Sequence, residues 1–116
     1  MDFSKTPIDQ LAAIIAEHLC EQDIHVVLVG GLAVEIYSRN IYLTKDIDMV
    51  NISYQKPQVV RRAMAELGFN KQGRVYVNST TAITVEFPSG PLSVGDELIQ
   101  QTTLVQVAPG VRIVVA

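Results

Sequence analysis

Hydrophobic residues recur at helical spacing in two segments of the chain. The first segment runs from Pro7 to about Cys20, with Thr6 expected to cap it and Pro7 to occupy its first helical position. The second runs from Pro57 to Leu67 and is followed by a glycine, a common residue at the end of a helix. This periodicity predicts two helices that each pack one apolar face against a sheet. The two faces consist of Ile8, Leu11, Ala12, Ile15 and Leu19, and of Val59, Val60, Ala63, Met64 and Leu67.

Apolar and β-branched runs predict the strands of that sheet. Residues 25–29 are almost wholly apolar, which is typical of a strand buried on both faces. Residues 46–52 predict a second core strand, and a short helix is expected between the two, over residues 32–39. The layout predicts an α+β or α/β two-layer fold, with a mixed sheet and helices packed on one face. The remaining strands are predicted at residues 74–78, 82–87, 104–107 and 111–115, the last two forming a hairpin.

Length, composition and charge narrow the classes of protein to consider. The 116 residues are expected to form one domain over residues 1–116, and 48% hydrophobic residues argue against disorder. A net charge of −3 excludes a generally basic surface for capturing nucleic acid, but leaves room for a local basic cluster around a phosphate. The single Cys20 is expected to be a small core residue in a reducing, cytoplasmic setting. No apolar run is long enough for a membrane span.

Residues 26–50 combine the features that favour a chemical site. An apolar strand leads into Gly30-Gly31, where no side chain blocks a phosphate and the following helix start favours an anion. Asp46 and Asp48 lie one residue apart in the next predicted strand, so they project from the same face. Two such carboxylates repel each other and can hold Mg²⁺. A phosphate cradle beside a metal site is the minimum needed for phosphoryl or nucleotidyl transfer.

A pair of metal ions usually needs a third carboxylate, and three acids downstream are candidates. Glu86 lies between Val85 and Phe87, where a solvated charge has no obvious role. If its strand pairs with the strand of the two aspartates, Glu86 could complete the site and act as general base. Asp96 and Glu97 lie in a polar stretch and are expected to be solvated.

Simpler interpretations of the same residues stay open at this point. The glycine pair alone is typical of a tight turn, and the two aspartates could form the exposed face of a strand. Glu86 could lie harmlessly on an edge strand. Arg39 and Lys45 could contact phosphates or belong to the ordinary surface. His18 and His25 have no acid or cysteine at metal-ligand spacing, so structural roles are expected for both.

The order of these motifs carries a family resemblance. Gly30-Gly31 after an apolar strand, the run from Thr44 to Met49, and a carboxylate in a later strand resemble the nucleotidyltransferase superfamily, with its DNA polymerase β-like fold. The most similar subgroups are the minimal nucleotidyltransferases of toxin–antitoxin systems and the AbiEii-type toxin-like proteins. The resemblance covers roughly residues 24–88, and the Thr-Lys-Asp-Ile-Asp run is its most specific part.

The resemblance implies a set of site residues and a reaction. The reaction would move a nucleoside monophosphate from a nucleoside triphosphate (NTP) to a hydroxyl group on a protein, an RNA or a small molecule. The implied site has Gly30 and Gly31 at the phosphates, Asp46, Asp48 and Glu86 as ligands of one or two Mg²⁺ ions, and Arg39, Thr44 and Lys45 as flanking phosphate contacts. The alternative is an inactive nucleotide-binding or protein-interaction module of the same fold, and a metal-dependent phosphohydrolase is a third interpretation.

Two features of the chain depart from the family pattern. Gly31 replaces the serine that many members use to touch phosphate. The sequence stops at Ala116 after a predicted strand, where relatives continue into C-terminal helices that build the acceptor side. We therefore expect a minimal form, a truncated chain, or a protein that obtains the missing part from a partner. An antitoxin or toxin partner or a homodimer would fit this expectation.

Overall fold

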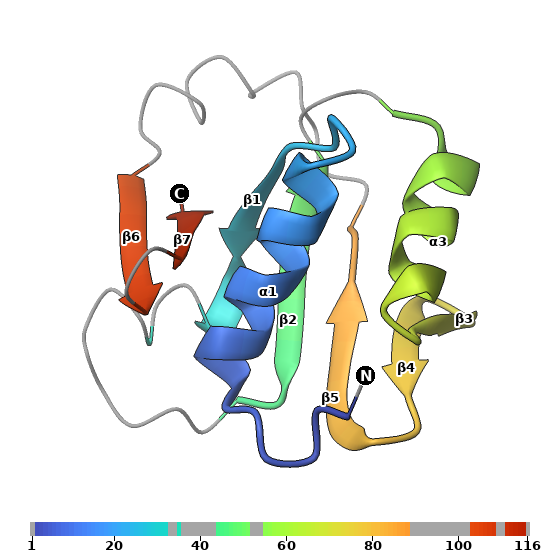
Figure 1. Ribbon diagram of the computed structural model, residues 1–116, viewed down its shortest axis with the longest axis horizontal. Helices are drawn as coiled ribbons and strands as arrows, with labels where there is room; N and C mark the ends of the chain where they lie inside the picture. Colours follow the sequence, from blue (N-terminus) through green and yellow to red (C-terminus); the bar gives the residue numbers. More distant parts are fainter. Residues whose placement is uncertain are drawn as a thin grey trace.

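The computed structural model describes residues 2–32, 35, 44–51, 55–88, 103–108 and 111–115, and only the backbone of the last two ranges. Its strands form one mixed sheet with the order β3-β4-β5-β2-β1-β7-β6 (Figure 1). The protein is therefore α+β, as the sequence predicts. The elements are α1 (Ile8–Cys20), β1 (Val26–Val29), β2 (Asp46–Asn51), α3 (Pro57–Glu66), β3 (Asn70–Gln72), β4 (Val75–Asn78), β5 (Thr81–Glu86), β6 (Thr103–Ala108) and β7 (Val111–Val115).

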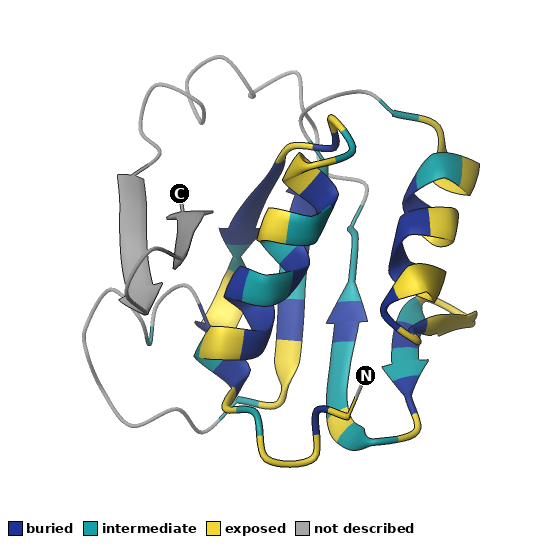
Figure 2. Cartoon of the chain, viewed as in Figure 1, coloured by how far each residue is buried: buried dark blue, intermediate teal, exposed yellow. Residues whose placement is uncertain are grey.

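Both long helices bury the apolar faces predicted from their periodicity. α1 and α3 lie on the same side of the sheet, and their buried residues follow one side of each helix (Figures 1 and 2). All five apolar residues predicted for α1 are buried, and in α3 only Val59 is partly exposed. The predicted cap is wrong, because Pro7 is the N-cap of α1 and no side chain caps this helix. Gly68 follows α3 with a φ of +86°, a backbone conformation that favours glycine.

The centre of the sheet brings the two predicted core strands together. β1 pairs antiparallel with β2, and β2 pairs parallel with β5. Ile47 and Met49 are fully buried on the side of the sheet that faces the helices. Because side chains alternate along a strand, Asp46 and Asp48 project from the opposite side. The helices cover one face of this region, and the carboxylates occupy the other.

Strand β4 shows the alternation expected of a half-exposed strand, but its more buried residues are polar. Tyr76 and Asn78 are buried, whereas Val75 and Val77 are partly exposed. The Tyr76 ring packs edge-on against Phe87, with ring centroids 5.5 Å apart. The amide nitrogen of Asn78 donates to the Leu67 carbonyl at 3.1 Å, and its Oδ1 accepts the Thr80 N–H at 2.8 Å. These bonds satisfy the buried amide, so its burial carries little penalty.

Two further expectations differ from the structure or lie partly outside it, and one strand was not predicted. Cys20, the last residue of α1, is exposed rather than part of the core. The strand β3 has no apolar pattern to predict it, since all three of its residues are polar and exposed. Residues 31, 32 and 35 are helical, and the rest of the helix expected over 32–39 lies outside the described residues.

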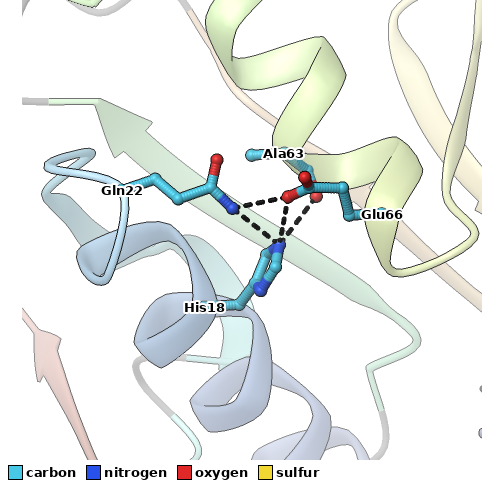
Figure 3. Close-up of polar contacts among 4 residues, drawn as sticks. All are labelled: His18, Gln22, Ala63 and Glu66. Atoms are coloured by element: carbon cyan, nitrogen blue, oxygen red, sulfur yellow. Dashed lines mark hydrogen bonds and ion pairs between the residues drawn. The ribbon is translucent and has the colours of Figure 1, made fainter.

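His18 joins the two long helices (Figure 3). Its Nε2 lies 3.0 Å from the Ala63 carbonyl oxygen and 3.1 Å from Glu66 Oε1, and with a proton on Nε2 it donates to both. The Gln22 amide also donates to Glu66 Oε1, at 2.6 Å. The structural role expected for His18 is therefore confirmed.

Replacing His18 tests this link. We expect His18→Ala to lower the free energy of unfolding by about 1 kcal/mol, the usual net value of such hydrogen bonds. Chemical denaturation at pH 7 measures this, with Glu17→Ala as the matched control, because Glu17 is exposed on the same turn of α1. Equal losses in the two variants would show that His18 does not link the helices.

Candidate functional site

The glycine pair follows β1 and places its first member against an aspartate of β2. Gly30 has a φ of +79°, which favours glycine over residues with a side chain. A Cβ atom at this position would lie 2.6 Å from Asp48 Oδ2, closer than real atoms approach. Gly31 has more room, since a Cβ there would come no nearer than 3.8 Å to Thr44 Oγ1. The positive φ thus favours glycine at position 30, and a side chain there would displace the Asp48 carboxylate.

The parallel pairing of β2 with β5 brings three carboxylates to one face. Asp46 lies opposite Thr84, and Asp48 lies opposite Glu86. Paired residues on neighbouring strands project from the same face, so Asp46, Asp48 and Glu86 share the face of the sheet away from the helices. The structure therefore pairs the strand of Glu86 with the strand of the two aspartates, the condition on which the third carboxylate depends.

The side chains of Thr84, Thr44 and Glu35 form hydrogen bonds that hold β2 and the residues before it in place. Thr84 Oγ1 donates to Asp46 Oδ1 at 2.6 Å, and the other carboxylate oxygen has no hydrogen-bond partner among the described residues. The Asp46 N–H donates to Thr44 Oγ1 at 3.3 Å, and the Thr44 N–H donates to Glu35 Oε1 at 3.0 Å. Sequence reasoning missed Thr84 and Glu35. Thr84 could have been found as the residue two before Glu86, on the same face of its strand.

Like charges and burial raise the pKa of Asp48 above its ordinary value. Burial is the main cause, followed by the negative charge of Glu86 and then that of Asp46. Among the described residues, none of the three carboxylates forms an ion pair with a lysine or arginine. The face therefore carries negative charge that the described part of the protein does not neutralise.

This donor set fits a divalent cation. Carboxylate oxygens are the ligands that Mg²⁺ prefers, and a bound cation would relieve the repulsion that raises the Asp48 pKa. Within the described part of the chain, however, no three His, Cys, Asp or Glu side chains have converged into a metal-binding group. The three carboxylates are thus on one face of the sheet and suitable in kind for a cation.

Of the other predicted site residues, some lie close to the carboxylates and the rest lie outside the described residues. Thr44 lies beside Gly31 and bonds to Asp46, as described above. Lys45 is exposed, and its backbone carbonyl accepts the Thr84 N–H at 3.0 Å. Arg39, Asp96 and Glu97 lie outside the described residues.

Comparisons with known proteins do not name a family. No protein-family model matches the chain, and no curated protein sequence matches it. Among the described residues, no helix has the length and apolar character to cross a membrane.

Gly30 and Gly31 should differ in their tolerance of a side chain. We expect Gly30→Ala to lower the free energy of unfolding by about 1–3 kcal/mol, because it combines a positive φ with a close contact. Gly31→Ala should change it by less than about 1 kcal/mol, since Gly31 is helical and has space. Chemical denaturation of both variants measures the difference. A Gly30→Ala protein as stable as Gly31→Ala would contradict the described turn.

The raised pKa of Asp48 predicts how stability depends on pH. The folded protein holds a proton on Asp48 more tightly than the unfolded chain does, so this group lowers stability as pH rises through the raised pKa. Asp48→Asn removes the charge without changing the shape. We expect this variant to melt a few degrees higher than wild type at pH 7, with the gap narrowing as the pH falls towards about 4.

Thermal unfolding monitored across that pH range measures the gap. Asp46→Asn is the matched control, because Asp46 is more exposed and its amide oxygen can still accept from Thr84. Its effect should be smaller than that of Asp48→Asn. A lower melting temperature for Asp48→Asn at pH 7 would show that the carboxylate stabilises the fold instead.

Proposed function

We propose that the protein is a magnesium-dependent nucleotidyltransferase that moves a nucleoside monophosphate from an NTP to a hydroxyl acceptor. The observation that carries the proposal is the alignment of Asp48 with Glu86 on neighbouring parallel strands, with Gly30 directly against Asp48. This places a glycine turn and three carboxylates in one region of the sheet. The nucleotidyltransferase-like fold, with this face open to substrate and helices on the other, is part of the same proposal.

Each group of residues has a distinct part in the proposed reaction. Asp46, Asp48 and Glu86 would hold Mg²⁺, which supplies positive charge at the phosphates when it is bound. The backbone at Gly30 and Gly31 would receive the phosphates, because no side chain intervenes. We also assign phosphate contacts to Thr44, Lys45 and Arg39.

The chemical step is an in-line displacement at the α-phosphate. Glu86 accepts the proton of the attacking hydroxyl, whose oxygen forms a new bond to the α-phosphorus. The bond between the α-phosphorus and the bridging oxygen breaks, and pyrophosphate leaves. Glu86 suits this part because it lies at the end of β5, half-buried beside Asp48, where a hydroxyl can approach it.

Transfer assays test the proposal directly. We expect label from an α-labelled NTP to appear on an acceptor in the presence of Mg²⁺, and to disappear in the Asp46→Asn/Asp48→Asn protein. Asp9→Asn/Asp23→Asn is the matched control, since it removes two acids that lie outside the carboxylate face. Equal labelling by the carboxylate variant and the wild type would rule out the assignment of Asp46 and Asp48.

A non-catalytic nucleotide-binding or protein-interaction module of the same fold is the second candidate. Calorimetric titration with ATP and Mg²⁺ separates the two candidates. Binding in the titration without labelling in the transfer assay supports the module. Release of phosphate or mononucleotide in the transfer assay, without a labelled acceptor, indicates a phosphohydrolase.

A further inference from the structure

Two cavities lie beside α3 and the hairpin of β3 and β4. One cavity of about 310 Å³ is lined by Phe87 and Pro88, just beyond the end of β5. Another, of about 590 Å³, lies along α3 and β3, and Lys71 lines both. Cavities of this size are typical of small-molecule sites. The proposed nucleotidyl transfer uses neither of them.

Positive charge is concentrated around these cavities although the whole chain is acidic. Five of the nine lysine and arginine residues lie between residues 56 and 74, a stretch with Glu66 as its single acid. Glu66 is engaged with His18 and Gln22 on the side of α3 that faces α1. Lys71 and Arg74 line the first cavity, and Lys71 and Arg61 line the second. No acidic residue is among the described residues that line either cavity.

The geometry of β3 and β4 directs this charge towards an aromatic wall. Lys71 lies opposite Tyr76 in the antiparallel pair, so both side chains share one face. Tyr76 packs edge-on against Phe87, and both rings line the first cavity. Burial raises the pKa of the Tyr76 hydroxyl, and the guanidinium of Arg61 beside it offsets part of that rise. Arg61, which lines the second cavity, therefore lies beside the Tyr76 hydroxyl.

The side chains of Lys71 and Arg74 have no ion-pair or hydrogen-bond partner in the part of the chain that the structure describes. α3 also begins beside the first cavity, at Pro57, with no acid in its first turn and no capping side chain. Its N-terminus adds to the positive potential there. Cations that line a hollow beside aromatic rings, without acids to neutralise them, are suited to an anion with an organic group.

We propose that the first cavity binds a small phosphate monoester whose organic group contacts Tyr76 and Phe87. A phosphate monoester carries a charge of about −1.5 to −2 at pH 7, which matches Lys71, Arg74 and Arg61 better than the single charge of a carboxylate. Arginine also binds phosphate through two parallel hydrogen bonds. The apolar wall provides affinity for the organic group that inorganic phosphate lacks.

Calorimetric titrations at low salt, without Mg²⁺ or NTP, test the binding site independently of the proposed transfer. The probes are phenyl phosphate, inorganic phosphate, benzoate and phenol. We expect phenyl phosphate to bind with a stoichiometry of one and more tightly than the other three. Absence of phenyl phosphate binding at millimolar concentration would overturn the proposal. Benzoate binding as tightly as phenyl phosphate would also overturn it, because the site would then not distinguish phosphate from carboxylate. Equal binding of phenol would overturn it too, because apolar contact alone would then explain the affinity.

Two charge-matched variants separate a built site from general attraction. Lys71→Gln/Arg74→Gln removes two cations that line the first cavity, whereas Lys56→Gln/Arg62→Gln removes two exposed cations that line neither cavity. We expect the first variant to weaken phenyl phosphate binding by about tenfold or more, and the second by less than about threefold. Equal weakening would show that surface charge alone attracts the probe. All four residues are exposed, so both variants should fold.

Discussion

The burial of Asp48 beside two other carboxylates on one face of the sheet is the constraint around which the candidate site is built. Asp48 meets Glu86 across the β2–β5 pair, and Asp46 lies two residues earlier on the same face. Backbone pairing of the two strands enforces this proximity, although the charges oppose it. The surrounding residues accommodate it, because Thr84 donates to Asp46 and Gly30 leaves space for the Asp48 carboxylate. Carboxylates whose pKa is shifted by burial and by neighbouring charges occur often at functional sites.

Local periodicity predicted much of the fold. Residues that are close in sequence predict the buried faces of α1 and α3. They also predict β1, the glycine pair that follows it, and β2 with its two aspartates. The exposed polar strand β3 could not be predicted in this way, since it has no alternation and owes its pairing to β4. The burial of Asn78 also depends on distant partners, because its amide bonds to Leu67 across a turn.

The sequence predicted the acidic residues of the candidate site, but it did not predict the residues that hydrogen-bond to them and to their neighbours. Asp46, Asp48 and Glu86 stand out because charges interrupt apolar strands, a signal that one sequence carries. Thr84 and Glu35 are ordinary residues in sequence, and they acquire their roles through strand register and a long-range hydrogen bond. The cations around the two cavities are likewise scattered along α3 and the β3–β4 hairpin, and the fold brings them together.

The parallel pairing of β2 with β5 also bears on how the chain folds. Asp46 and Thr84 are 38 residues apart, and α3, β3 and β4 lie between their strands. Pairing at this separation closes a long loop, which is slower than forming α1 or the β3–β4 hairpin. The carboxylates therefore meet only when this non-local step is complete. The repulsion between Glu86 and the two aspartates therefore acts late in folding, after the early helices and the β3–β4 hairpin have formed.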